Sequence, residues 1–511
     1  MPVVSPPAAT GLRGRRSGLV GTASSGRIPL NLSACSPRAE TPAPTPPCVT
    51  RSGGWRAGTG LTQPRRFRPS RTEGLYRPAP GTALLAPMRH IRTRMGALGV
   101  ALLAAVPLSL TAPAHAATAP GSTVEEGRLT QAAPQEILRR SGFDAWAGDF
   151  GAGLARVTTY PQARRYVADE GRALWRRAVD RAQGRGPDGG DLSRDDDRPL
   201  YWARLGMTSQ LRAWRPDFPL TGARRAALLD ALERGSRGQD SIDLPAGQHV
   251  LRIVVTGFDP FQLDDDARRS NPSGAAALAL DGTTVRTASG EPARIETAVF
   301  PVRWADFAQG TVERTLLPHF RSGPRQADLF TTISQGRPGR FDVERTNGAW
   351  RGGYPDNARA ERTGTVPIPA GVPTVLPQPQ WTVTSLPYAR IVAAGTGPYP
   401  VVDHTAVTEI PAGGTTPVER PDGPTAGSTA RAGGGGDYLS NEIAYRATLL
   451  RDAVRPALPG GHLHTPVLEF GAANTDPSGP VTDPDFVRNR VAITEQVRAI
   501  LTVAASGAAR R

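Results

Sequence analysis

The run VLRIVVTGF at residues 250–258 is the feature that most restricts what this chain can fold into. It is a continuous β-branched run that ends in Thr-Gly, which is typical of a strand buried on both faces of a parallel sheet. Such a sheet needs helices over both faces, and helical stretches do alternate with further strands downstream. The sequence predicts strands at 293–302, 327–334 and 465–470, and helices at 305–317, 438–454 and 483–504. We therefore expect an α/β domain over 248–511, with a mainly parallel twisted sheet flanked by helices.

The chain before this domain has a different spacing of apolar residues. Residues 117–247 place apolar side chains at three- and four-residue spacing, which predicts a small helical domain ahead of the sheet. Residues 395–431, rich in Pro, Gly and Thr, are expected to form an insertion on the surface of the α/β domain. The two runs of three aspartates, at 195–197 and 264–266, lack the alternating ligands and glycine of a calcium loop, so we expect solvated loops there.

The first 116 residues divide into two parts. Residues 1–87 are rich in Pro, Ser, Arg and Gly without apolar periodicity, and they predict disorder or an upstream extension that is not translated. From Met88 a basic segment, an apolar run over 95–110 and Ala114-His115-Ala116 have the form of a secretion signal cleaved near Ala116. Pro107 interrupts the apolar run, which is shorter than the roughly 20 residues of a membrane span. The sequence predicts a secreted protein with no membrane span after cleavage.

Charge and cysteine content restrict the function further. Residues 1–116 contain 15 arginines against Glu40 and Glu73, so they carry almost all of the net charge of +15. The remainder is nearly neutral, and no nucleic-acid partner is expected. Cys35 and Cys48 both precede the signal, so a mature chain would have no disulfide, no thiolate metal ligand and no cysteine nucleophile. Nothing in the sequence predicts a cofactor.

Two segments that follow strands carry side chains suited to binding or catalysis. Phe258 and Phe261 follow the first strand and precede Asn271 at the start of a helix. They could line an apolar pocket or anchor the loop in the core. The next strand runs into Gln335 and a Gly and Arg loop, after which comes Glu344 beside an arginine. Such a pair is ordinarily an exposed ion pair that contributes little, but a carboxylate here could also serve catalysis.

The stretch GGGGDYLSNEIAY and the stretch GGHLHTP supply the remaining candidates. Ser440 lies where the glycine run enters a helix, either as one more small polar residue behind a cap at Asp437 or as a nucleophile. His462 and His464 precede the strand expected at 465–470. A His-x-His pair can bind metal when both side chains face one way, but no third ligand of matching type is apparent. We predict no metal site.

A nucleophile at a helix start, a histidine and a carboxylate form the set that acyl transfer requires. The motifs VVTGFDPF with NPS, ISQGRPGRFDVER with YPDN, GGDYLSNEIAY and HLHTP occur in that order. In this order they resemble the pyroglutamyl peptidase type I family, also called pyrrolidone carboxyl peptidase, over most of residues 250–504. That family removes N-terminal pyroglutamate from peptides with a Glu, Cys and His triad on an α/β sandwich.

The resemblance implies a role for each matching residue of this chain. Glu344 matches the orienting carboxylate, His464 the general base, and Ser440 stands where the family has its cysteine nucleophile. Phe258 and Phe261 match the aromatic residues that hold the lactam ring. The remaining positions where the family's pocket is lined are Asn271, Gln335, Tyr438 and Leu439.

Serine in place of cysteine leaves three hypotheses. In the first, the chain is a secreted hydrolase that acts on peptides with N-terminal pyroglutamate through Ser440, His464 and Glu344. In the second, it is an inactive pseudo-peptidase that binds peptide N-termini, because a hydroxyl is a far weaker acid than a thiol and demands accurate base geometry. In the third, the helical region acts as an interaction module on an inherited scaffold.

Overall fold

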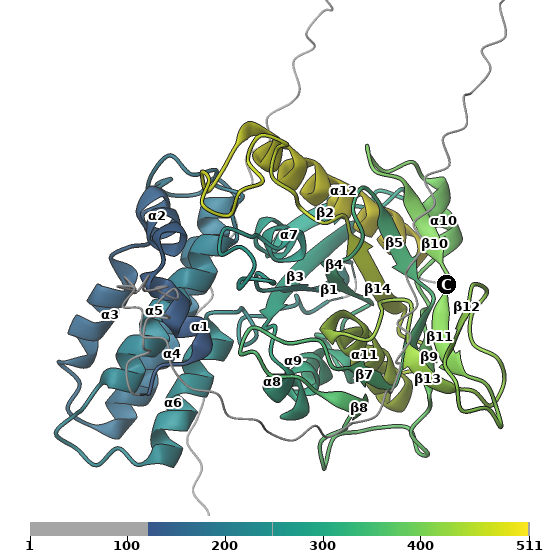
Figure 1. The fold of residues 1–511 in the computed structure, drawn as a ribbon, viewed down its shortest axis with the longest axis horizontal. Helices are drawn as coiled ribbons and strands as arrows, with labels where there is room; N and C mark the ends of the chain where they lie inside the picture. The colour runs from purple at the N-terminus through teal and green to yellow at the C-terminus, as the bar shows by residue number, and fades with distance from the viewer. Residues whose placement is uncertain (1–120, 248, 509–511) are drawn as a thin grey trace, which may run out of the picture. The chain divides into compact units, whose positions relative to one another are not determined.

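The computed structural model describes residues 121–247 and 249–508 (Figure 1). The expected disordered extension and the expected secretion signal lie outside these residues. None of the helices within the two described ranges has the length and apolar character that crossing a membrane requires.

The centre of the fold is a seven-stranded sheet (Figure 1). In spatial order its strands are β10 (Val401–His404), β5 (Phe341–Glu344), β14 (Gly460–Thr465), β4 (Leu329–Gln335), β1 (Leu251–Phe258), β3 (Pro292–Phe300) and β2 (Thr283–Arg286). The four strands β14, β4, β1 and β3 are parallel to one another. β2 and β5 are antiparallel to their neighbours β3 and β14, and β10 is parallel to β5. The predicted α/β class with a mainly parallel sheet is confirmed.

Helices cover both faces of this sheet because β1 is buried along its whole length and its alternate side chains point to opposite faces. Ile253 and Val255 pack on one face, while Val254 and Phe258 pack on the other. The first face is covered by α7 (Pro272–Leu280), α10 (Tyr388–Ala393) and α12 (Pro484–Ala508). The second is covered by α8 (Trp304–Ala308), α9 (Thr311–Phe320) and α11 (Leu439–Val454).

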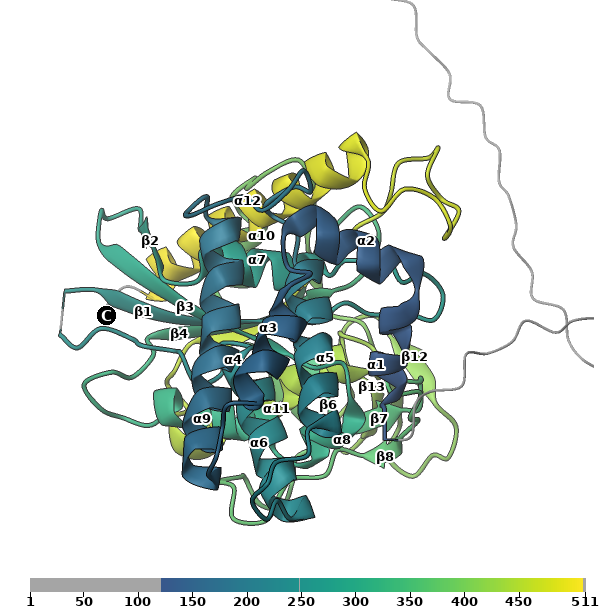
Figure 2. The ribbon, with the colours of Figure 1, turned by 90° about the vertical axis from the view of Figure 1, so that its left-hand side faces the viewer.

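The helical region expected ahead of the sheet is present, and its helices stand side by side in Figure 2. It comprises α1 (Val124–Gly127), a short 3₁₀ turn (Arg128–Thr130), α2 (Ala132–Ser141), α3 (Trp146–Leu154), α4 (Tyr160–Ala182), α5 (Arg198–Ala213) and α6 (Gly222–Gly235). Its apolar core is continuous with Leu278 of α7 and Val299 of β3. Arg204 of α5 binds Asp259, directly after β1, at 2.5 Å in a fully buried ion pair.

The surface insertion expected over residues 395–431 needs correction at its start. Residues 401–404 form β10, a strand of the central sheet, because their backbone pairs in parallel with β5. The later strands do lie apart from that sheet, in a three-stranded antiparallel sheet of β11 (Val407–Ile410), β12 (Val418–Arg420) and β13 (Thr429–Ala432). Two further pairs join β6 (Thr346–Gly348) to β9 (Trp381–Val383) and β7 (Trp350–Gly352) to β8 (Thr363–Thr365).

Two local expectations are also wrong. The strand expected at 465–470 lies earlier, at Gly460–Thr465, because Pro466 has no N–H to donate to a neighbouring strand. His462 and His464 are therefore inside a central strand and not ahead of it. The expectation of solvated aspartate runs fails for Asp196, Asp197 and Asp266, which are buried. Asp196 forms an ion pair with Arg198, and Asp197 accepts from the N–H of Asn271 at 3.0 Å.

Candidate active site

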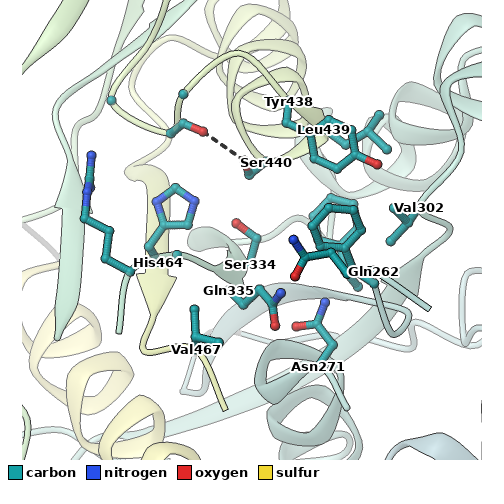
Figure 3. Close-up of a pocket in the computed structure, with 17 residues that line it drawn as sticks. Gln262, Asn271, Val302, Ser334, Gln335, Tyr438, Leu439, Ser440, His464 and Val467 are labelled. Atoms are coloured by element: carbon teal, nitrogen blue, oxygen red, sulfur yellow. Dashed lines mark hydrogen bonds between the residues drawn. The ribbon is translucent and has the colours of Figure 1, made fainter. Parts of the chain in front are cut away.

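A pocket of about 380 Å³ opens where the carboxyl ends of β1, β4 and β14 meet the start of α11 (Figure 3). Parallel strands bring their carboxyl ends to one edge of the sheet, where α/β proteins ordinarily place their binding sites. Eight of the nine residues singled out from the sequence line this pocket: Phe258, Phe261, Asn271, Gln335, Tyr438, Leu439, Ser440 and His464. The ninth, Glu344, lies behind His464.

Glu344 and His464 are joined by a short hydrogen bond. The Nδ1 of His464 lies 2.6 Å from Oε1 of Glu344, and the carboxylate is fully buried. The alternative of an exposed Glu-Arg pair does not hold, since Arg345 binds Asp403 at 3.1 Å instead. Because an ionised carboxylate only accepts, Nδ1 of His464 carries a proton, and in the neutral form of this imidazole Nε2 is the acceptor.

A second histidine, which the sequence reasoning missed, contacts the same carboxylate. The Nδ1 of His404 lies 2.6 Å from Oε2 of Glu344. Burial alone would raise the pKa of the Glu344 carboxyl, but the hydrogen bonds from His404 and His464 and the attraction to their rings lower it to about 2. Glu344 is therefore ionised at neutral pH. The signal that could have revealed His404 is the short β-branched run Val401-Val402 just before it, which is typical of a strand.

The glycine run allows its backbone to lie close to Glu344 and His464, in addition to making the loop flexible. A Cβ on Gly434 would lie 2.0 Å from Oε2 of Glu344, and one on Gly435 would lie 3.1 Å from Cε1 of His464. The loop backbone therefore presses against both residues, which any side chain larger than hydrogen would prevent.

Ser440 is the second residue of α11. The helix begins at Leu439 with Tyr438 as its N-cap and without a side-chain cap, so the expected cap at Asp437 is wrong. The backbone N–H groups of Leu439, Ser440 and Asn441 have no acceptor among the described residues. The Oγ of Ser440 donates to the carbonyl of Gly435 at 2.9 Å (Figure 3), and no hydrogen bond within the described part of the chain joins it to His464.

The start of α11 is fixed by two polar anchors next to Ser440. Asn441 donates from Nδ2 to the carbonyl of Gly348 at 2.8 Å and accepts from the N–H of the same glycine at 2.8 Å. Glu442 accepts two bonds of 2.6 Å from Arg351, and both side chains are buried. Because the anchors are on the residues that follow Ser440, its backbone position is well defined.

The far wall of the pocket is aromatic. The ring of Phe261 lies 5.0 Å from that of Tyr438, and Phe258 stacks on Phe307 at 6.1 Å between centroids. Burial raises the pKa of Tyr438 far above its usual range, and its hydroxyl donates to the Pro355 carbonyl at 3.1 Å. This wall suits a flat apolar ring.

The two amides of the pocket differ in their freedom to bind a ligand. Asn271 accepts from the N–H of Ser273 at 3.1 Å and donates to the carbonyl of Asp259 at 2.9 Å, so it caps α7. Gln335, at the end of β4, forms no side-chain hydrogen bond with another described residue. Gln335 is therefore the amide available to a ligand, while Asn271 mainly shapes the wall.

The family models and a relative of similar sequence agree on one family. The model described as "PA0049 N-terminal domain" matches residues 108–233, and that described as "PA0049, C-terminal domain" matches 252–378 and 401–469. The "Uncharacterized protein PA0049" of Pseudomonas aeruginosa is 36% identical over 460 residues, which cover 72% of this chain and 83% of the relative. This chain belongs to the PA0049 family.

Solved structures are more distant from this PA0049-family chain. Pyroglutamyl peptidase I of Bacillus amyloliquefaciens is 21% identical with a TM-score of 0.32, over 50% of this chain and 97% of that one. Pyrrolidone carboxyl peptidase of Thermococcus litoralis is 15% identical with a TM-score of 0.33, over 49% and 93%.

The pocket of this chain also contains a serine hydroxyl bonded to an imidazole, which sequence reasoning missed. Ser334 lines the pocket with its Oγ 2.9 Å from Nε2 of His462, whose Nδ1 is 2.8 Å from Oγ1 of Thr332. Burial lowers the pKa of His462 well below its usual range, so this imidazole is neutral. Within the described ranges no cluster of three or more His, Cys, Asp or Glu residues is arranged to hold a metal ion. Ser334 is thus a second hydroxyl in the pocket, and a test of Ser440 as the nucleophile has to distinguish the two serines.

Proposed function

We propose that this PA0049-family chain is a hydrolase that removes N-terminal pyroglutamate from peptides, with Ser440 as its nucleophile. The observation that carries the proposal is the 2.6 Å bond between His464 Nδ1 and Glu344 Oε1. It fixes the tautomer in which Nε2 of His464 can accept a proton, in a pocket that Ser440 also lines. A buried carboxylate, an imidazole and a hydroxyl in this order are the parts of an acyl-transfer site.

In the proposed reaction the Oγ of Ser440 attacks the carbon of the peptide carbonyl that follows the pyroglutamyl ring, and not the lactam carbonyl. His464 accepts the hydroxyl proton at Nε2. Glu344 remains ionised and stabilises the imidazolium that forms. The free N–H groups at the start of α11 stabilise the oxyanion. His464 then gives the proton to the leaving amine, and water hydrolyses the acyl-enzyme by the reverse sequence.

The hydroxyl of Ser440 must turn before it can attack. In the structure its proton is held by the Gly435 carbonyl, and a rotation about the Cα–Cβ bond of Ser440 is the motion that redirects it toward His464. The anchors on Asn441 and Glu442 hold the backbone, so the change is confined to the side chain.

The pocket walls support a lactam as the ligand. Phe258, Phe261 and Tyr438 offer apolar ring faces, and the free amide of Gln335 can both donate to and accept from a lactam. The proposed mechanism needs no cofactor. We also propose that the protein acts outside the cell, on the basis of the signal-like segment at residues 88–116.

A pseudo-peptidase that binds peptide N-termini is the second candidate. The bond from Ser440 Oγ to Gly435 favours it, because a hydroxyl held away from the base is not activated. In this case the pocket retains pyroglutamyl peptides without cleaving them.

Hydrolysis of a chromogenic pyroglutamyl amide separates the two. We expect turnover by the wild type, none by Ser440→Ala, and an acyl group on the Ser440 peptide when the reaction is quenched and examined by mass spectrometry. Turnover only in Ser440→Cys would reject the serine mechanism. An acyl group on Ser334 would identify Ser334, and not Ser440, as the nucleophile. If no variant is active, calorimetry with an uncleaved pyroglutamyl peptide decides whether the pocket binds that ligand at all.

A further inference from the structure

We infer that His404 is a positioning residue of this site, which holds one carboxylate oxygen of Glu344 so that the other stays on His464. The inference rests on the proposed function for its effect on turnover, but the array of His404, Glu344 and His464 can also be tested without turnover.

The array is built by strand pairing. β10 and β5 are parallel, and His404 is the register partner of Glu344. The N–H of Arg345 donates to the His404 carbonyl at 3.0 Å, which fixes the backbone beside both residues. Each carboxylate oxygen then has its own imidazole donor at 2.6 Å, His464 on Oε1 and His404 on Oε2. The side chain of His404 is only 12% exposed, and that of Glu344 is 0% exposed.

A buried carboxylate needs donors on both oxygens. With a donor on Oε1 alone, Oε2 would be a desolvated acceptor without a partner, which is unfavourable for a buried ionised group. The carboxyl group could also rotate about its last torsion, because such sp³–sp² torsions are broad. The bond from His404 fixes the plane of the carboxyl, and the plane sets the direction in which His464 is held.

The nucleophile makes this support more important. A thiolate is already a strong nucleophile and has no proton to transfer to a base during attack. A serine hydroxyl loses its proton during attack and therefore needs an accurately placed imidazole. His404 does not itself line the pocket, so it acts through Glu344 and does not touch the substrate. The charged neighbours Arg345 and Asp403 bind each other at 3.1 Å, which leaves His404 as the partner of Oε2.

Substitutions at His404 give the kinetic test, made on the full chain. In His404→Ala the donor is lost, and we expect kcat to fall on the order of 10- to 100-fold with KM nearly unchanged. In His404→Asn the side-chain amide can donate from almost the same place as Nδ1, and we expect most of kcat to return. His319→Asn on α9, a histidine outside the pocket, is the matched control and should behave as the wild type.

Proton NMR of histidine-labelled protein gives the second test, which needs no turnover. Imidazole N–H protons bonded to a carboxylate at this distance resonate far downfield. We expect two such signals in the wild type and in His319→Asn. In His404→Asn we expect one to vanish and the signal of His464 to persist, while in His404→Ala the His464 signal should shift or broaden.

Two results would overturn the inference: a kcat of His404→Ala equal to that of the wild type, or a His464 signal that does not change when the donor is lost. If His404→Ala does not fold, His404→Gln replaces it, because its amide extends one methylene beyond the position of Nδ1 and should restore less kcat than His404→Asn. If the wild type does not hydrolyse the substrate, only the proposed function is rejected. The NMR signals still show whether His404 and His464 both bond to Glu344 and whether His464 depends on His404.

Discussion

The hydroxyl of Ser440 donates a 2.9 Å hydrogen bond to the carbonyl oxygen of Gly435, and Gly435 itself packs against the imidazole of His464. The preceding residue, Gly434, packs against the carboxylate of Glu344. One short loop therefore contacts the hydroxyl, the imidazole and the carboxylate of the proposed triad. The relative placement of these three groups depends on the loop backbone as much as on their own elements.

A thiol at position 440 should report on this environment directly. Sulfur is a weak hydrogen-bond donor, so Ser440→Cys should release the bond to Gly435, and the helix start together with His464 should favour the thiolate. We expect iodoacetamide to label Cys at 440 at least about tenfold faster than an ordinary exposed thiol. Mass spectrometry of the labelled peptides measures the rate, and glutathione added to the same reaction serves as the reference thiol, because residues 117–511 contain no cysteine of their own.

The same experiment has two controls. His464→Gln in the Ser440→Cys background should slow the labelling of that thiol, since the imidazole is lost. In the wild type, iodoacetamide should leave activity unchanged, because residues 117–511 contain no cysteine. Labelling at 440 no faster than that of glutathione, with or without His464, would contradict an activating site.

The glycine loop should tolerate a methyl group at one position and not at another. In Gly434→Ala the new Cβ would lie 2.0 Å from Oε2 of Glu344, so the carboxylate or the loop must move and activity should fall by about 100-fold. Gly436→Ala is the control: its Cβ meets no atom within 4 Å, although its φ of +79° costs about 1–2 kcal/mol of stability. Kinetics and thermal unfolding of both variants check this. Because Gly436 also lines the pocket, its methyl group can change KM, so the comparison is made on kcat. Equal losses of kcat in the two would show that strain, and not the contact with Glu344, is responsible.

The sequence allowed the sheet class and the pocket to be predicted because their signals are local. β1 is a single buried run, and the pocket residues follow strand ends or begin helices. Their order along the chain resembles that of the pyroglutamyl peptidase type I motifs, so Ser440, His464 and Glu344 could be named as candidates before any distance was known. The structure brings these residues together, with Ser440 and His464 in one pocket and Glu344 bonded to His464.

His404 could not be found in this way because its partner is 60 residues away along the chain. Only the pairing of β10 with β5 brings the two together, and a four-residue strand inside a Pro- and Gly-rich segment gives a weak signal. The true N-cap of α11 was missed for a similar reason. Tertiary anchors on Asn441 and Glu442 place the helix start one residue later than the local capping pattern at Asp437 indicates.

The ionised state of Glu344 should stabilise the fold near neutral pH, and acid should remove this contribution. Its pKa falls from an ordinary 4.5 to about 2, so its contribution is complete above pH 4.5 and is lost as the pH falls through 2. The shift corresponds to about 3 kcal/mol. We expect the difference in free energy of unfolding between the wild type and Glu344→Gln, measured by urea denaturation, to shrink between pH 4.5 and pH 2. A difference that stays constant over that window would mean that the carboxyl is not held ionised by the two histidines.

The N-terminal helices should be required for the α/β region to fold. Asp259, which directly follows Phe258 of the pocket, accepts from Arg204 at 2.5 Å and from Arg237 at 2.8 Å, and all three side chains are buried. A fragment of residues 249–508 would leave Asp259 without either arginine, and it would expose the apolar surface around Leu278. We expect this fragment to aggregate or stay unfolded, while residues 121–508 unfold cooperatively in circular dichroism.

Single substitutions give the matched comparison for the fragment experiment. Arg237→Ala removes one partner of a buried carboxylate, and we expect it to destabilise the chain by about 3–5 kcal/mol. Arg314→Ala removes the exposed pair with Asp230, which also joins the helical region to the α/β region, and it should cost at most about 1 kcal/mol because both side chains are nearly half exposed. If the fragment folded and bound pyroglutamyl peptide, the helical region would be a separable domain and the buried pairs at Asp259 would not be what holds the pocket loop.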